Sequence, residues 1–385
     1  MRCCCALLTE IHFVPQPGPP PATPIVPPIT PPACKAGEKP VQVFIGLGQS
    51  NMLGEGEKMN NPKKPSNTTL QDAVFNQKKF PYLEANGNWS TSKTVRDVFV
   101  MASGGVNAAG AKFPITLFHN EFMTGAISTP KAAPWKNHFG SGTMAPRAKP
   151  SIGPELGIGG MLEQHYKDEP VMWLKSCIGN RALGWDLLPP TQTQRQTFGN
   201  YTYAAYHESP MKWLSSGPKP KPINWVAGLQ YDGDVSRANA VLNDIPTFYP
   251  GKTCYEVAGF FWWQGDKDSR DMGLSTHYEA NLVAFIKQLR VQFGSPKAKF
   301  VTASLGQTAQ GAIDGGGRIL DAMEHVADGK TYPEFKGNVA AVYTHPLENT
   351  PGSSGGHYGG DAITYMNIGE AMGKAMTKML AADKN

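Results

Sequence analysis

The most informative stretch of the chain is Val41-Gln-Val-Phe-Ile-Gly-Leu-Gly-Gln-Ser-Asn-Met52. Its apolar, β-branched and aromatic residues predict a short buried strand that ends at Gly48, and a serine follows two residues later. A strand that stops at a tight turn can present one hydroxyl at the edge of a sheet, as in other strand-to-turn nucleophile sites. Ser50 is therefore the first candidate nucleophile, although a polar turn without chemical function would have the same composition.

The remaining elements predict the architecture around this strand. Apolar runs indicate further buried strands near residues 171–175, 257–263, 299–304 and 339–343, and helical patterns cover 153–166, 278–292 and 365–380. Buried strands separated by helices are typical of a parallel sheet that is covered on both faces. We therefore expect an α/β fold, a three-layer α/β/α sandwich with a central parallel sheet.

Three segments fit this alternation poorly. Residues 1–38 contain ten prolines between Pro15 and Pro32, which predicts a disordered tail or linker before a single folded domain over 39–385. Residues 84–149 and 187–250 are rich in Gly, Pro, Asn, Trp and Tyr, so we expect them to be long loop insertions. In open parallel sheets, such loops wall the ligand crevice at the carboxyl ends of the strands.

Charge and cysteine content exclude several classes of function. The net charge is +5, from 36 basic and 31 acidic residues that are scattered along the chain, so we expect no nucleic-acid partner. No apolar run is long enough for a membrane span, and residues 1–10 form no clear signal peptide. No Cys/His spacing predicts a metal site. Cys177 and Cys254 lie in or beside predicted strands, where buried free thiols are the default expectation.

Further motifs follow Ser50 in a fixed order along the chain. They are Gly153-Pro-Glu-Leu-Gly157, Lys175-Ser-Cys-Ile-Gly-Asn-Arg-Ala-Leu183, Trp263-Gln-Gly-Asp266, and a histidine before the last helix at His357-Tyr358. Together with Gly48-Gln-Ser-Asn-Met52 they resemble the SGNH hydrolases, and among these the carbohydrate esterases of the sialate O-acetylesterase and acetyl xylan esterase type. A serine early in the chain and a histidine late in it can form a Ser-His pair.

The resemblance implies a role for each motif. Ser50 would attack the ester carbonyl, and His357 would accept its proton. The backbone N–H groups of Ser50 and Gly179 and the side-chain amide of Gln264 would form the oxyanion hole. Substrate binding would fall to other residues of these motifs, namely Gln49, Asn51, Glu155, Asn180 and Arg181, although Glu155 is more consistent with bracing the helix that Pro154 opens. His345 is the one competitor to His357. No cofactor is implied.

The third member of a triad departs from the family pattern. Related enzymes often place an aspartate three residues before the histidine, but this chain has Ser354 there. Asp266 is the leading substitute, because it follows the strand-end Gln264-Gly265; it could equally hold the loop by accepting backbone N–H bonds. The remaining alternatives are Asp268, Glu348 and Asp361, or a Ser-His pair oriented by a backbone carbonyl.

The sequence thus predicts a metal-independent serine esterase that removes O-acetyl groups from a carbohydrate, either acetylated xylan or a related glycan, or acetylated sialic acid. Two alternatives stay open: a lipid or small-ester hydrolase on the same scaffold, and a carbohydrate-binding protein that has lost turnover. The resemblance to polysaccharide-active enzymes favours a secreted or periplasmic location. The sequence does not fix the oligomeric state.

Overall fold

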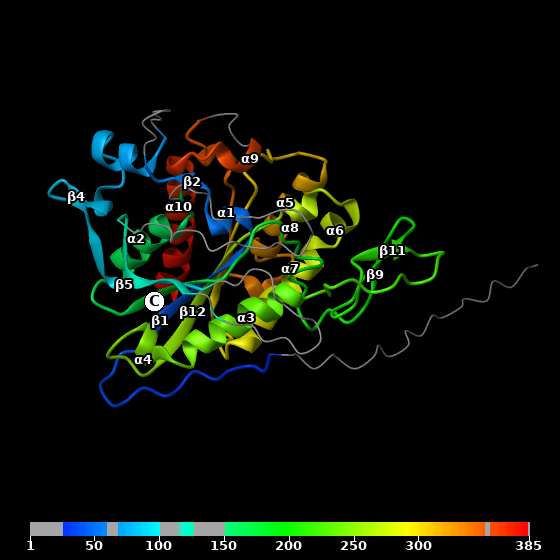
Figure 1. Ribbon diagram of the computed structural model, residues 1–385, viewed down its shortest axis with the longest axis horizontal. Helices are drawn as coiled ribbons and strands as arrows, with labels where there is room; N and C mark the ends of the chain where they lie inside the picture. The colour runs from blue at the N-terminus through cyan, green and yellow to red at the C-terminus, as the bar shows by residue number, and fades with distance from the viewer. Residues whose placement is uncertain are drawn as a thin grey trace, which may run out of the picture.

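The computed structural model describes residues 26–59, 68–100, 115, 117–126, 151–350 and 355–383. Its centre is a seven-stranded sheet in the order β14-β13-β12-β1-β8-β5-β6 (Figure 1). The strands are β1 (Val41–Gly48), β5 (Thr91–Val100), β6 (Leu117–Thr124), β8 (Val171–Lys175), β12 (Tyr255–Trp263), β13 (Lys299–Ala303) and β14 (Val339–Val342). Every neighbouring pair is parallel except β5 and β6, so the sheet is mostly parallel with an antiparallel edge.

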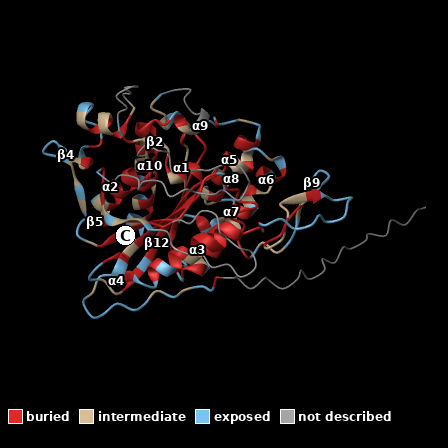
Figure 2. Ribbon diagram, in the orientation of Figure 1, coloured by how far each residue is buried: buried red, intermediate tan, exposed pale blue. Residues whose placement is uncertain are grey.

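Helices cover both faces of this sheet. Alternate residues of β12 enter two separate cores, because successive side chains of a strand point to opposite faces. Phe260 and Trp262 pack in the core with helices α3 (Leu229–Leu242), α7 (Tyr278–Gln292) and α8 (Gly315–Ala327). Phe261 and Trp263 pack in the core with α2 (Glu155–Tyr166) and α10 (Ala362–Ala382). Figure 2 shows the sheet as a buried layer between the helices. The predicted α/β/α sandwich is therefore confirmed.

The remaining elements are short and lie mainly in the connections. They are the helices α1 (Ser50–Leu53), α4 (Ile245–Phe248), α5 (Asp266–Ser269), α6 (Met272–Thr276) and α9 (Gly355–Tyr358); the π-helical turn Asp72–Asn76; the 3-10 turns Pro81–Leu83, Pro333–Phe335 and His345–Leu347; the strand pairs β2 (Gly56–Glu57) with β7 (Ser151–Ile152) and β3 (Glu84–Ala85) with β4 (Asn88–Trp89); and the three-stranded sheet of β9 (Gln196–Phe198), β10 (Tyr201–Tyr203) and β11 (Lys212–Leu214).

The two expected insertions are partly elements of the core. β5, from the stretch 84–149, pairs with β8 inside the main sheet, and α3, from the stretch 187–250, packs on one face of it. Both were missed because their apolar residues are interrupted by charged ones, such as Arg96 and Asp97 in β5. The sheet of β9, β10 and β11 does extend from the body as an arm, as an insertion would (Figure 1). Residues 101–114 and 127–150 lie outside the described part.

The expectation of a loose tail is wrong for residues 26–38. Val26 is buried, the Ile29 N–H donates to the Gln292 carbonyl at 2.9 Å, and Cys34 forms a disulfide with Cys254. This also corrects the expectation of a free thiol at Cys254, whereas Cys177 is free and buried. Nothing in the sequence indicates this pairing, because 220 positions separate the two cysteines. The prediction for residues 1–25 lies outside the described part.

The fold brings the ends of β1 and β12 together. In the parallel register Gly48 lies opposite Trp263, so the segments that follow both strands emerge side by side at the carboxyl edge of the sheet. Gly48 has a φ of +150°, and a Cβ atom there would lie 2.3 Å from the Trp263 carbonyl oxygen. Glycine is therefore required where β1 stops. Within the described ranges, no helix is long and apolar enough to cross a membrane.

Candidate active site

Ser50 is the first residue of α1, directly after the turn that ends β1. The Gln49 N–H donates to the Trp263 carbonyl at 3.2 Å, which ties this turn to the end of β12. Ser50 is only 6% exposed, so its position is set by the surrounding protein. The strand, the glycine and the tied turn together present a single hydroxyl at the carboxyl edge of the sheet.

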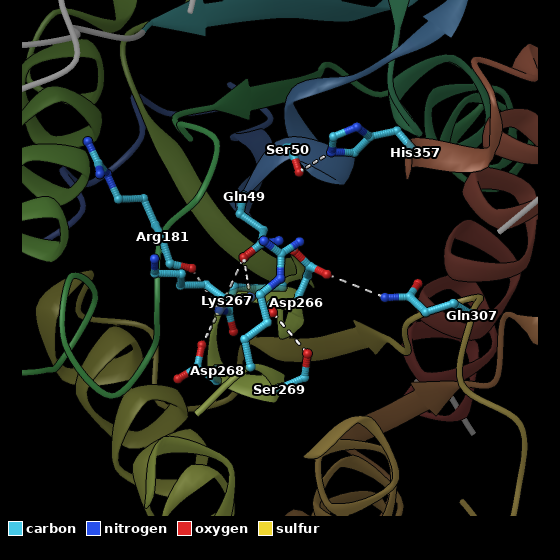
Figure 3. A network of polar contacts seen from close by, with 11 residues as sticks. Gln49, Ser50, Arg181, Asp266, Lys267, Asp268, Ser269, Gln307 and His357 are labelled. Carbon is cyan, nitrogen blue, oxygen red and sulfur yellow. Dashed lines mark hydrogen bonds and ion pairs between the residues drawn. The ribbon is translucent and has the colours of Figure 1, made fainter. Parts of the chain in front are cut away.

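The imidazole of His357 faces this hydroxyl. The Nε2 atom of His357 and the Oγ atom of Ser50 lie 2.7 Å apart, although 307 positions separate the residues in the sequence. Figure 3 shows the two side chains pointing toward each other from α1 and from the segment before α10. A nucleophile within hydrogen-bond reach of a base is the arrangement that acyl transfer needs.

Gln264 lies at the end of β12, fully buried, and its side-chain amide is committed to protein groups. The Nε2 atom donates to the Arg181 carbonyl at 2.8 Å and to the Asp268 carboxylate. The Oε1 atom accepts a hydrogen bond from the Tyr278 hydroxyl at 3.0 Å. An amide has two N–H donors, and the two shorter contacts use both of them, with Gln49 Oε1 at 3.5 Å as a third acceptor nearby. The expectation that Gln264 donates to the oxyanion is therefore not met by its contacts, and Gln264 instead holds the loop after β8.

Asp268, four positions after Gln264, binds the same loop after β8. Its carboxylate accepts the N–H groups of Leu183 at 2.9 Å and Gly184 at 3.0 Å, besides the amide of Gln264. Burial raises the pKa of Asp268 to about 6, against the lowering effect of these three donors. Asp268 thus joins β12 to the loop that carries Gly179, and it does not contact His357.

Asp266 and Asp361 also bind groups other than the imidazole. Asp266 pairs with Arg270 at 2.6 Å and lies 3.5 Å from the Gln307 amide. Figure 3 shows Asp266 and Gln307 pointing toward each other. Asp361 caps α10 through the Thr364 N–H and accepts the Asn349 side chain at 3.0 Å. The expectation that Asp266 orients His357 is therefore not supported by its contacts.

The structure also places Glu348, an alternative third member of the triad, and His345, the alternative to His357. Glu348 lies close enough to Tyr358, the residue after His357, to raise the pKa of that phenol together with its burial, burial being the larger cause. His345 binds the Gly306 carbonyl through Nδ1 at 2.5 Å, whereas Ser50 is bound by His357. The family's usual aspartate position, Ser354, lies outside the described residues.

Most of the residues that were expected to bind substrate are buried and engaged with the protein. Gln49 accepts from the Lys267 N–H at 3.4 Å, Asn51 accepts from the Tyr365 hydroxyl at 3.1 Å, and Glu155 binds Lys175 at 3.1 Å. The guanidinium of Arg181 lies over the Trp225 ring at 4.6 Å and 3.8 Å from Asp186. Only Asn180 is exposed, with a φ of +58°. Glu155 begins α2 and also accepts the Gly153 N–H at 2.8 Å, contacts that agree with the bracing alternative for this residue.

The sequence did not single out Tyr278. Its hydroxyl accepts from the Trp262 indole N–H at 3.0 Å and donates to Gln264, so it fixes which way the Gln264 amide points. Tyr278 begins the helix that was predicted over 278–292, and a tyrosine at such a position looks like any core residue. Only the proximity of β12 and α7 shows its role. In the described part of the chain, no group of three or more His, Cys, Asp or Glu side chains could hold a metal ion.

A comparison with protein families finds one match. Residues 212–378 match the family model of the carbohydrate esterases described as sialic acid-specific acetylesterases. This segment includes Gln264, Asp268 and His357. No curated protein matches the chain.

Several solved structures are similar to the chain at low identity. One is a carbohydrate acetylesterase from Xanthomonas citri, with 14% identity and a TM-score of 0.47 over 87% of this chain and 55% of that one, so the chain spans about half of its length. A protein from Arabidopsis thaliana has 15% identity and a TM-score of 0.45, over 88% of this chain and 98% of that one. NanS has 16% identity and a TM-score of 0.36, over 82% and 84%. Because these scores are low, the similarity to a family rests on residues 212–378 alone, which match the carbohydrate esterases described as sialic acid-specific acetylesterases.

Proposed function

We propose that this protein is a carbohydrate esterase that removes O-acetyl groups from its sugar substrate through a Ser-His acyl-enzyme mechanism. The observation that carries the proposal is the 2.7 Å contact between Ser50 Oγ and His357 Nε2. A serine hydroxyl is a weak nucleophile unless a base removes its proton as it attacks, and an imidazole is the side chain best suited to do so near neutral pH.

The reaction follows from this pair in two stages. Ser50 Oγ forms a bond to the acetyl carbonyl carbon while its proton moves to His357 Nε2. The tetrahedral intermediate then breaks the bond to the sugar oxygen, which takes the proton from His357 and leaves as a hydroxyl. In the second stage His357 removes a proton from water, which attacks the acetyl-serine and releases acetate with Ser50 restored.

The oxyanion donors that we propose are the backbone N–H groups of Ser50 and Gly179. Ser50 begins a helix directly after the tied turn, and Gly179 lies in the loop that Gln264 and Asp268 hold against β12. Gln264 supports this hole indirectly, because its two N–H groups are bound to Arg181 and Asp268. Donors that are fixed before the reaction stabilise the developing charge without reorganisation.

The substrate that we propose is a neutral or acidic acetylated glycan, with acetylated xylan and acetylated sialic acid as the two candidates. We also propose an oxidising compartment, the cell exterior or the periplasm, for which the Cys34–Cys254 disulfide is the support. Both proposals go beyond the family match.

Hydrolysis of p-nitrophenyl acetate by the purified protein, with Ser50→Ala and His357→Ala as controls, tests the mechanism. We expect turnover by the wild type and a loss of about a thousandfold or more in each variant. Acetate release from acetylated xylan, from acetylated sialic acid and from longer acyl esters then identifies the substrate. Binding of a glycan without acetate release would instead support a carbohydrate-binding protein, and preference for long acyl chains would support a lipid esterase.

A further inference from the structure

The catalytic imidazole is carried by a backbone turn of unusual conformation. Four consecutive residues have positive φ values: His357 at +63°, Tyr358 at +55°, Gly359 at +62° and Gly360 at +84°. Residues with a Cβ atom rarely adopt this left-handed conformation, and two of the four have one. Such a turn persists only where the surrounding structure holds it, and strain of this kind is concentrated at functional sites.

Hydrogen bonds close the turn and attach it to a neighbouring strand. The Gly360 N–H donates to the His357 carbonyl and the Asp361 N–H to the Tyr358 carbonyl, each at 3.0 Å. From outside, the Glu57 N–H of β2 donates to the Gly360 carbonyl at 2.7 Å. The backbone on the C-terminal side of His357 is therefore fixed at both ends.

The buried side chain of Tyr358 holds the same turn against the core. Its ring is 1% exposed and packs against Trp263 and Tyr365, with centroid distances of 6.0 Å and 5.6 Å. Its hydroxyl accepts the Gly306 N–H at 3.1 Å. A Cβ atom at Gly306 would lie 2.3 Å from the Tyr358 ring, so this contact requires glycine there. Successive side chains of the left-handed turn thus point to different places, Tyr358 into the core and His357 to Ser50.

We propose that Tyr358 and the left-handed turn 357–360 are a positioning device that holds the His357 imidazole at Ser50. This inference rests on the proposed Ser-His mechanism and adds the residues that orient its base. It also explains how the site can operate without a carboxylate three residues before the histidine, since the backbone turn restricts the imidazole from the C-terminal side. A displacement of about 1 Å at a reacting group can cost about a hundredfold in rate.

Gly359 offers a direct test of the turn. It has a φ of +62° with nothing within 4 Å of a Cβ atom, so Gly359→Ala adds backbone strain without a clash. Gly337→Ala is the matched control, because Gly337 is also exposed, has a φ of +71° and has equally empty surroundings. Gly359→Asn is the rescue variant, because asparagine tolerates this conformation better than alanine.

We expect Gly359→Ala to lower kcat by ten- to a hundredfold with little change in KM, and to slow inactivation of Ser50 by phenylmethylsulfonyl fluoride by a similar factor. Gly337→Ala should change neither quantity by more than about twofold, and Gly359→Asn should recover most of the loss. Equal kinetics for Gly359→Ala and wild type would overturn the positioning role. A wild type that neither hydrolyses acetyl esters nor reacts with the inhibitor would instead remove the mechanism on which the inference rests.

Tyr358→Phe tests the anchor without removing the ring. It leaves the Gly306 N–H without its acceptor, so we expect kcat to fall about tenfold and KM to stay within about twofold. Tyr343→Phe is the control, because the Tyr343 hydroxyl also accepts a backbone N–H, from Gln310 at 3.0 Å. Equal losses in both variants would mean a general effect of losing such a bond and would count against the anchor. If Tyr358→Phe does not fold, the Gly359 series decides.

Discussion

Gln264 and Asp268, four positions apart in the sequence, share a hydrogen bond, and together they bind three backbone groups of the loop after β8. Gln264 donates to the Arg181 carbonyl, and Asp268 accepts from the N–H groups of Leu183 and Gly184. Gln264 and Asp268 therefore hold in place the loop that carries Gly179. In the mechanism proposed above, this loop would carry one of the two backbone N–H donors of the oxyanion hole, and Gln264 and Asp268 would hold it in position.

Asp268 and Asp266 should respond very differently to the same substitution. Asp268→Ala leaves three buried N–H donors without an acceptor, so we expect a loss of about 3 kcal/mol or more in stability and a large loss of activity. Asp266→Ala removes a pair with the exposed Arg270, and such pairs contribute at most about 1 kcal/mol. Chemical denaturation and p-nitrophenyl acetate hydrolysis measure both effects. An inactive but stable Asp266→Ala variant would instead support Asp266 as the third member of the triad.

Gln264→Ala should weaken the enzyme without abolishing it. We expect turnover to fall about a hundredfold, because the Arg181 carbonyl loses its donor and the loop of Gly179 shifts. Ser50→Ala should be nearly inert, because no other hydroxyl replaces the nucleophile. Gln307→Ala, which removes an amide from the exposed side of Asp266, is the control. Steady-state kinetics of the three variants check this order, and equal activity of Gln264→Ala and wild type would contradict it.

The stability of the protein should depend on pH through Asp97, which lies in β5. This carboxyl is buried, its Oδ1 atom has no hydrogen-bond partner among the described residues, and burial raises its pKa to about 7 from 3.8. Lys175 lowers this pKa, whereas Glu155 and Glu121 raise it. The folded state therefore binds the proton more tightly than the unfolded state, so stability falls as the pH rises from about 4 to about 7.

Asp97→Asn should remove this dependence, because the amide stays neutral at every pH. Between pH 5 and pH 8 the free energy of unfolding of the wild type should fall by on the order of 3 kcal/mol, whereas the variant should not show this fall. Thermal unfolding of both proteins at the two pH values measures the difference. A change in Tm on substitution that is the same at pH 5 and pH 8 would exclude this role of Asp97.

The disulfide should contribute substantially to stability. Cys34 and Cys254 close a loop over 220 positions, and cross-links of long loops stabilise by about 3–5 kcal/mol, chiefly by restricting the unfolded chain. We expect dithiothreitol and Cys34→Ser to lower the free energy of unfolding by similar amounts. Dithiothreitol should have no further effect on Cys34→Ser, and an additional loss there would show that another cysteine is involved.

The sequence was sufficient for features that local chemistry encodes. The apolar runs of β1, β8, β12, β13 and β14 were recognisable because buried parallel strands are continuously hydrophobic. β5 was missed, since Arg96 and Asp97 interrupt its apolar pattern, and the sequence does not show that Arg96 binds Asn120 or that Asp97 is buried. The packing of residues 26–38 was also missed, because prolines predict an extended segment whether or not it lies against a folded body.

By itself the sequence determined which residue types stand at the strand ends, and hence Ser50 and His357 as the reactive candidates. Only the tertiary structure decided the partners of each polar side chain. From the sequence alone, the roles of Gln264, Asp266 and Arg181 as donor, base or substrate ligand could not be told apart. A residue's role depends on the groups that surround it in space, and only the structure shows these. The left-handed turn at His357 was equally hidden, since tertiary contacts hold a backbone conformation that its local sequence disfavours.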